Sequence, residues 1–224
     1  MCTNYTPTRN QKWVAQHLGA ELPSEPYPPE AFPGYAAPIA LAGHAGKTQC
    51  RLARFGLVPH WAQDATLGRK TYNARTETVA EKPSYRTAWR KRQFAIALLD
   101  DFFEPNWETG RAVRWRIKRA DGEPMGVASL WDQWTDPGSG EVVTSFTMLT
   151  VNADGHTVMG KFHRPGDEKR SVVVLEAGQF EAWLRAEGSQ ANAMLRPPPE
   201  GLLVAEAAAV GAAVGVASGQ AGLF

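Results

Sequence analysis

The strongest constraint on the fold is a series of apolar, strand-like segments separated by turn signals. "QFAIALLDDFF" at 93–103 is a short apolar run typical of a buried strand. "AVRWRIKR" at 112–119 alternates apolar with basic residues, which predicts a strand with one buried face. Asp121-Gly122 and "DPGSGE" at 136–141 are turn signals, so we expect hairpins that link 112–119 to "MGVASLWDQW" and that segment to "VVTSFTMLTV".

Further strands are expected at 50–59 and 171–176. The segment 21–47 is rich in Pro and Gly and is expected to be irregular. A helix is predicted to start at Thr8 as N-cap and to end before Gly19.

Another helix is predicted over 179–188, closed by Gly188, and a capping-box pattern at Thr78 and Glu81 marks a short or broken helix before Pro83. These signals together predict an α+β fold, with a largely antiparallel, curved, barrel-like sheet and a few flanking helices.

Composition narrows the class of protein. The chain has 224 residues, 43% hydrophobic and 21% charged, which is typical of one globular domain. We expect this domain to span 2–197, followed by an Ala/Gly-rich tail at 198–224. No apolar run approaches the ~20 residues of a membrane helix, and no secretory signal is evident. A cytoplasmic monomer without metal or cofactor, associated with the nucleoid when bound to DNA, is therefore expected.

The net charge of +1 predicts no partner by itself, so a nucleic-acid surface would have to be a local patch. Arg86 and Arg90 belong to the one dense basic cluster, 86–92, which could contact phosphates or simply face solvent. Trp61 and Trp107 stand near polar motifs and could stack on bases.

Cys2 is the more unusual of the two cysteines, because it directly follows the initiator methionine. Removal of Met1 would place a thiol and a free α-amine on one residue, and the nearby ammonium would lower the pKa of the thiol. Such a 1,2-aminothiol condenses with an aldehyde and then closes a five-membered thiazolidine. Taken alone, Cys2 could equally be an ordinary frayed terminus.

Three other stretches carry reactive or binding groups. "TYNARTETV" places Asn73, Arg75 and Glu77 on one face of an extended segment, where an amide and a guanidinium could bind a sugar-phosphate. Glu104 ends an apolar run, which favours a raised pKa and proton transfer. His163 lies in a Gly/Pro-rich loop and could shuttle protons. Each of these residues alone could also be an ordinary surface group.

In this order, the motifs resemble the SRAP family (SOS response-associated peptidase domain), which includes sensors of abasic sites in DNA. The resemblance covers about 2–176 and depends on Met-Cys at the start, "GLVPHW" at 56–61, "NARTET" at 73–78, "EKPSYRTAWRKR" at 81–92, Phe-Phe-Glu at 102–104, the segment 147–150 and a histidine. The combination of Cys2 with "NARTET" is specific, whereas each piece alone is not.

The resemblance implies binding of single-stranded DNA and covalent capture of abasic sites. It implies that Cys2 is the nucleophile, that Asn73 orients the opened sugar, and that Glu104 and His163 transfer protons. Arg75 would contact a phosphate.

The chain also departs from the family pattern. The usual Met-Cys-Gly-Arg start has Thr3 and Asn4 here, so a basic contact is missing. "DGFYEW" is replaced by "DDFFEPNW", and "HxRMP" by "HRPGDEKR", where Arg164 or Arg170 could take the role of the family's arginine.

We therefore expect an abasic-site processing protein whose partner is single-stranded DNA and which crosslinks through Cys2. Two alternatives remain open from the sequence. One is a thiol (auto)peptidase that uses Cys2 and His163, with Glu104 or Asn73 orienting. The other is a DNA-binding module that has lost the chemistry.

Overall fold

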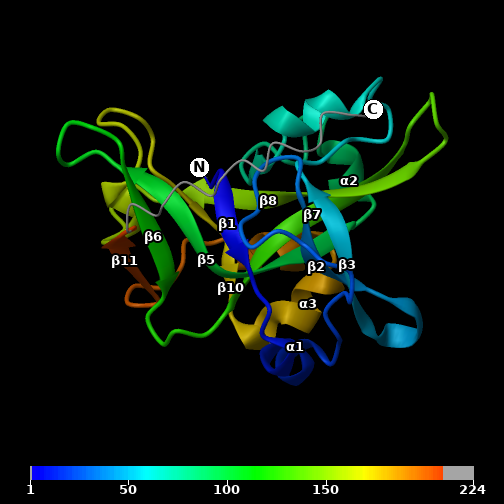
Figure 1. The fold of residues 1–224 in the computed structure, drawn as a ribbon, viewed down its shortest axis with the longest axis horizontal. Helices are drawn as coiled ribbons and strands as arrows, with labels where there is room; N and C mark the ends of the chain where they lie inside the picture. Colours follow the sequence, from blue (N-terminus) through cyan, green and yellow to red (C-terminus); the bar gives the residue numbers. More distant parts are fainter. Residues whose placement is uncertain (1, 209–224) are drawn as a thin grey trace.

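The computed structural model describes residues 2–208 and contains one 11-stranded sheet with short flanking helices (Figure 1). The strands are β1 (Asn4–Pro7), β2 (Ala36–Ala42), β3 (Thr48–Phe55), β4 (Asn73–Arg75), β5 (Phe94–Asn106), β6 (Val113–Arg119), β7 (Met125–Thr135), β8 (Val142–Asn152), β9 (Arg170–Val172), β10 (Val174–Leu175) and β11 (Leu203–Ala207). The helices are α1 (Gln11–Leu18), α2 (Arg86–Arg90), α3 (Phe180–Leu184) and α4 (Gly188–Met194).

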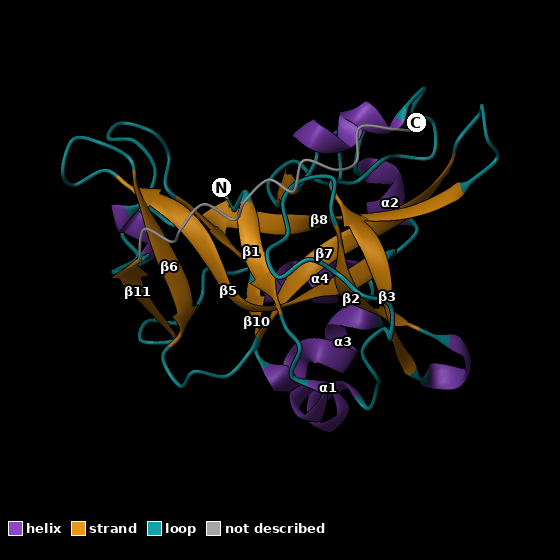
Figure 2. Ribbon diagram, viewed as in Figure 1, coloured by secondary structure: helices purple, strands orange, loops and turns teal. Residues whose placement is uncertain are grey.

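Five strands close into a barrel in the order β7-β8-β3-β2-β5, and β5 pairs back onto β7 (Figure 2). Most pairings are antiparallel, while β3 and β4 both run parallel to β8. Aromatic side chains fill one end of the core, where Phe55 stacks on Phe146 and meets Tyr5 and Tyr72 edge-on. The predicted α+β fold with a largely antiparallel, barrel-like sheet is confirmed.

β5 is the central strand of the molecule. Phe94–Leu99 pair with β7, and Asp101–Asn106 pair with β6. The predicted hairpin between 112–119 and the following strand is therefore wrong. β6 and β7 do not pair with each other, because each pairs with a different half of the 13-residue β5. The second predicted hairpin, β7–β8 across "DPGSGE", is confirmed by its continuous antiparallel register.

α1 begins two residues later than the sequence predicts. The side chain of Asn10, and not that of Thr8, accepts the hydrogen bond from the Trp13 N–H, at 3.0 Å. The helix ends as predicted at Gly19, whose φ of 59° is left-handed. Trp13 then packs edge-on against Phe180 of α3, so the two helices lie together at one end of the barrel (Figure 1).

Three local predictions are wrong. The helix predicted over 179–188 ends at Leu184, and Gly188 opens α4 instead of closing that helix. The capping-box pattern at Thr78 leads into turns, since Pro83 and the absence of an apolar helical face prevent a helix. The segment 21–47 contains β2, which is buried in the barrel despite its Pro- and Gly-rich surroundings.

The predicted domain boundary at 197 stays a prediction. Leu203–Ala207 form β11, which pairs with β6, so the first part of the predicted tail lies in the sheet. Residues 209–224 of that tail lie outside the described residues. Within residues 2–208, no helix combines the length and apolar character needed to cross a membrane.

Candidate functional site

Cys2 and Asn73 meet at the start of β1. β1 pairs with β5, and β4 runs parallel to β8 with Asn73 opposite Met148, which fixes both segments. The Asn73 side chain donates a hydrogen bond from Nδ2 to the Cys2 carbonyl at 2.6 Å. Tyr85, at the start of α2, donates its hydroxyl to the Asn73 carbonyl at 3.0 Å. The nucleophile candidate is thus held through its own backbone.

Asn73 keeps one polar atom available. Its Oδ1 is buried and has no hydrogen-bond partner among residues 2–208. A buried acceptor without a partner is costly, which favours a ligand or water that satisfies it. Asn73 therefore faces Cys2 with its donor and offers its acceptor to whatever enters the site.

Glu104 and His163 form a buried pair. The loop that follows η3 (Met159–Lys161) docks on the end of β5, where the His163 N–H donates to the Pro105 carbonyl at 3.3 Å. This contact places His163 Nε2 3.6 Å from Glu104 Oε2. The Glu104 side chain is 2% exposed and that of His163 is 13% exposed.

The backbone of His163 is unusual, because its φ of 66° is left-handed although the residue is not glycine. Lys169 stabilises this conformation from the other end of the loop. Its Nζ donates to the carbonyls of His163 and Arg164, at 3.3 and 2.7 Å. Lys169 was not identifiable from the sequence, since a lysine in a charged loop carries no signal of its own.

Burial shifts both members of the pair toward their neutral forms. It raises the pKa of Glu104, and it lowers the pKa of His163 to about 4. At neutral pH the imidazole is therefore an unprotonated base, and the carboxyl retains its proton to higher pH than an ordinary glutamate. This division gives the pair one acid and one base.

The thiol of Cys2 differs from the sequence expectation. Cys2 is 1% exposed, and burial raises the pKa of its thiol, with the Glu104 carboxylate acting in the same direction. A terminal ammonium acts in the expected, lowering direction, but the loss of hydration outweighs it and the thiol pKa is raised overall. A thiol in this environment needs a neighbouring base in order to react.

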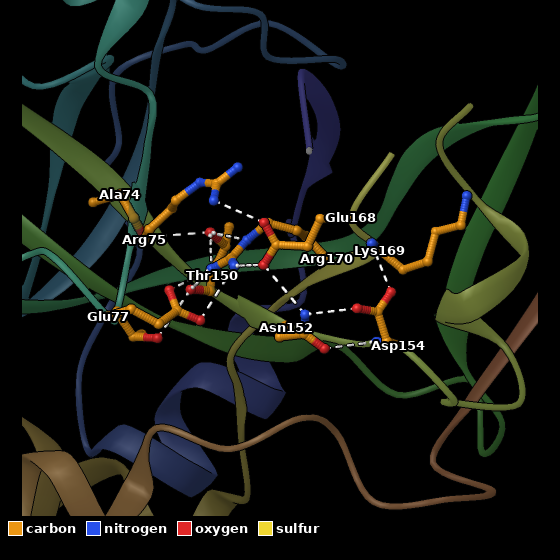
Figure 3. A network of polar contacts seen from close by, with 10 residues as sticks. Ala74, Arg75, Glu77, Thr150, Asn152, Asp154, Glu168, Lys169 and Arg170 are labelled. Atoms are coloured by element: carbon orange, nitrogen blue, oxygen red, sulfur yellow. Dashed lines mark hydrogen bonds and ion pairs between the residues drawn. The ribbon is translucent and has the colours of Figure 1, made fainter. Parts of the chain in front are cut away.

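Arg75 lies in a polar network and is not isolated on a solvated face (Figure 3). It contacts Glu168 at 2.7 Å, while the buried Arg170 bonds Glu168, Glu77 and the Thr150 carbonyl. Arg170 is thus committed to the structure, and Glu77 pairs with Arg170 instead of Arg75. The Arg75 side chain remains 51% exposed and can reach a ligand.

Replacing Arg170 with methionine is expected to lower the free energy of unfolding by about 3 kcal/mol, the lower end of the range for breaking a buried ion pair, since its carboxylate partners are partly exposed. Arg75 also pairs with Glu168, but this pair is exposed. Arg75→Met is therefore expected to lower the free energy of unfolding by no more than ~1 kcal/mol. Urea unfolding of both variants measures the difference, and equal losses would contradict a structural role specific to Arg170.

The other residues that the sequence predicts to contact DNA are exposed. Arg164 is exposed, and its guanidinium lies 5.0 Å from the Trp107 ring centroid. Trp61 is 46% exposed and donates its indole N–H to the Pro83 carbonyl at 3.3 Å. Arg86 and Arg90 are exposed on α2, directly after Tyr85. Their roles in binding DNA stay predictions.

Tyr72 is a further residue near the site that the sequence did not indicate, and Asp101 marks a departure from the family pattern. Cys2 and Glu104 both act electrostatically on Tyr72, whose pKa is raised mainly by burial. Asp101, which replaces the family's glycine, accepts from the Thr6 hydroxyl at 2.6 Å and contacts Arg116 at 3.3 Å. Among residues 2–208, no group of three or more His, Cys, Asp or Glu side chains could hold a metal ion.

Comparisons with known proteins show the family of this chain. The family model described as "SOS response associated peptidase (SRAP)" matches residues 1–216. Abasic site processing protein YoqW of Bacillus subtilis is 29% identical over 137 residues, which cover 61% of this chain and 57% of YoqW. Abasic site processing protein HMCES of Xenopus tropicalis is 27% identical over 120 residues, 45% of this chain and 36% of HMCES. The chain thus matches less than two thirds of these relatives' lengths.

Solved structures share the fold. A crystal structure of a Bordetella bronchiseptica protein superposes with a TM-score of 0.86 at 34% identity, covering 93% of this chain and all of the other. A Bacteroides thetaiotaomicron protein superposes with a TM-score of 0.77 at 20% identity, which shows the fold alone. Because the family model spans nearly the whole sequence, the chain belongs to the SOS response-associated peptidase family.

Proposed function

We propose that this protein binds single-stranded DNA and captures the ring-opened aldehyde of an abasic site as a thiazolidine on Cys2, after removal of Met1. Family membership and relatives that are named abasic site processing proteins support abasic-site processing as the broader activity. The residues around Cys2 support the finer statement.

One observation carries the proposal: Cys2 and Glu104, which are buried, and Asn73 and His163, which are partly buried, form one cluster. Asn73 holds the Cys2 carbonyl, Glu104 acts electrostatically on the thiol, and His163 lies 3.6 Å from Glu104. A thiol, a carboxyl with a raised pKa, a neutral imidazole and an unsatisfied amide oxygen are the groups that aldehyde capture needs.

The reaction balances with these groups alone. The neutral α-amine of Cys2 attacks the aldehyde carbon to give a carbinolamine. Protonation by Glu104 expels water and leaves an iminium ion. His163 takes the thiol proton as the sulfur adds to the same carbon, which leaves a neutral ring nitrogen, and this proton returns from His163 to Glu104, 3.6 Å away. The products are a five-membered ring and one water. The ring blocks the β-elimination by which DNA breaks at an aldehyde-bearing sugar.

A thiol (auto)peptidase is the alternative, which a buried thiol and a neutral histidine that both interact with Glu104 favour. The two activities differ in what they require of Cys2. A peptidase needs only the thiol, whereas the thiazolidine also needs a free α-amine.

The deciding experiment incubates untagged protein with a single-stranded oligonucleotide that contains one abasic site, followed by a denaturing gel. A slowly migrating band that is absent with undamaged DNA supports the proposal. Reduction of the aldehyde with borohydride before incubation should remove the band. If the wild-type protein forms no such band, the proposal is overturned. If that protein still binds the undamaged strand, a module that only binds DNA is indicated.

Arg75→Ala is expected to weaken binding of single-stranded DNA equally for all sequences, because a guanidinium on a phosphate reads no bases. The slope of log affinity against log salt should become shallower by roughly 0.7–1, the value for one phosphate. Filter binding at several salt concentrations measures the slope. Arg185→Ala, which breaks an exposed pair with Glu181 on α3, removes the same charge far from the site and serves as the control. An unchanged slope for Arg75→Ala would mean that Arg75 serves only to hold Glu168.

A further inference from the structure

A hollow opens beside Glu104. Its volume is about 280 Å³, and its lining is formed by Thr3, Asn4, Phe103, Glu104, Pro105, Ala112 and Arg114. The strand register explains this lining, since Asn4 of β1 lies opposite Phe103 and Arg114 of β6 lies opposite Pro105. β5 thus forms the floor of the hollow, and β1 and β6 form its walls.

Arg114 is held in place over this floor. Its guanidinium carbon lies 3.5 Å from the centroid of the Phe103 ring, and Nη2 contacts the Glu30 carboxylate. The side chain is still 47% exposed. A guanidinium has five N–H donors in one plane, so contact with one carboxylate oxygen leaves donors along the edge of the plane for a further acceptor.

The opposite wall is polar and uncharged. The Asn4 side chain donates to the same Glu30 oxygen that Arg114 contacts, and the Thr3 hydroxyl donates to Asn4 Oδ1 at 3.3 Å. Arg114 is the one cationic side chain among the residues that line the hollow. A guanidinium facing an amide and a hydroxyl, in an open hollow, suits a compact anion such as a phosphate.

We propose that this hollow binds a backbone phosphate of the DNA strand, through the guanidinium of Arg114. The inference rests on the proposed function, which places the abasic sugar against Glu104, because phosphates flank every sugar of a strand. Arg114 thereby provides a basic contact beside the nucleophile, where positions 3 and 4 of this chain have none.

Glu30 sets the strength of this contact. An ion pair as exposed as that between Glu30 and Arg114 contributes little, so a phosphate can share or displace it. The carboxylate nevertheless repels a phosphate in the same hollow. Glu30→Gln is therefore expected to tighten DNA binding, whereas loss of Arg114 weakens it.

The first test measures binding of an undamaged single-stranded oligonucleotide by fluorescence anisotropy at several salt concentrations. Arg114→Met should bind about fivefold more weakly at 0.1 M salt, with a slope shallower by ~0.7, because one phosphate contact on single strands contributes that slope. Arg114→Lys should retain most of the slope. Lys118→Met is the matched control, since Lys118 lies on the same face of β6 and pairs with Glu206 but does not line the hollow.

The second test locates the phosphate. Abasic oligonucleotides carry one uncharged methylphosphonate linkage, on either the 5′ or the 3′ side of the site, and initial crosslinking rates are measured below saturation. One of the two linkages should slow the wild-type protein about fivefold and leave Arg114→Met unaffected, because the contact is already absent. If, for both linkages, the loss caused by the methylphosphonate and the loss caused by Arg114→Met simply add, the inference is overturned. It is also overturned if Arg114→Met binds DNA with the affinity and salt slope of the wild-type protein, provided that thermal unfolding shows this variant to be folded.

The two proposals fail differently. Normal crosslinking by Arg114→Met, with wild-type salt dependence, overturns the role of Arg114 and leaves the proposed function intact. An Arg114-dependent slope on undamaged DNA without any crosslink to abasic DNA overturns the proposed function and leaves the phosphate contact standing. A wild-type protein that binds no DNA overturns both.

Discussion

Cys2→Ala is expected to abolish covalent capture of abasic DNA and to leave noncovalent binding of the same strand in place. The aldehyde carbon receives both ring-closing bonds from this residue, so no other side chain can replace it. A denaturing gel measures capture, and filter binding of the same samples measures affinity. A crosslink at the wild-type rate in Cys2→Ala would assign capture to another amine.

The α-amine is tested separately from the thiol. Intact-mass spectrometry of untagged protein is expected to show a chain that starts at Cys2. Insertion of a large residue such as arginine between Met1 and Cys2 prevents removal of Met1. This variant keeps the thiol of Cys2 and loses its free α-amine. It should form no thiazolidine, while a peptidase would retain activity. Retention of Met1 in crosslinking wild-type protein would contradict the thiazolidine chemistry.

Glu104→Gln is expected to slow crosslinking by roughly 10²–10⁴-fold, the usual contribution of a general acid or base. Glutamine keeps the shape of the buried side chain and removes the proton that expels water from the carbinolamine. A single-turnover time course on an abasic oligonucleotide measures the rate, and DNA binding should be unchanged. His163→Ala should slow the reaction in the same range.

Glu108→Gln is the control, because Glu108 is an exposed carboxylate four residues away. Asp101 is already engaged by Thr6 and Arg116. A wild-type rate in Glu104→Gln would pass the role of the acid to one of these two neighbours.

The pH dependence follows from the directions of the two pKa shifts. His163, with a pKa of about 4, is an available base throughout the neutral range, and the wild-type rate should fall below that value as the imidazole becomes protonated. Glu104, whose pKa is raised by burial, acts as an acid only below its shifted pKa. The rate should therefore decline again as the pH rises through that value, and Glu104→Gln should lose this alkaline limb while His163→Ala keeps it.

The barrel strands were predictable because they carry period-two patterns and turn signals that do not depend on distant residues. "DPGSGE" fixed the β7–β8 hairpin locally. The partners of β6 were not predictable in this way, since the choice between β5 and β7 depends on the length of β5. β2 was missed because the surrounding Pro and Gly residues resemble a loop until its neighbours β3 and β5 cover both edges.

The sequence indicated the raised pKa of Glu104, which ends an apolar run, but not the raised pKa of the Cys2 thiol. Cys2, Asn73, Glu104 and His163 are brought together as the motif order implied, while their roles stay predictions. The raised thiol pKa depends on burial by strands that no local pattern places. Arg114 resembled an ordinary solvent-facing residue of an alternating strand, because its contacts with Phe103 and Glu30 come from other parts of the chain.

The long-range pairing of β1 has a consequence for the order of events during synthesis. The strand that pairs with β1 along its whole length is β5, through Leu99–Phe103, and the His163 loop emerges later still. A ribosome adds about 5–20 residues per second, so on the order of 5–20 s separate the emergence of Cys2 from that of its covering strand. The methionine that the proposed chemistry must lose is therefore exposed to an aminopeptidase before the barrel closes over the residue behind it. Under the proposed function, removal of Met1 therefore precedes folding, and Cys2, the proposed nucleophile, is buried only afterwards.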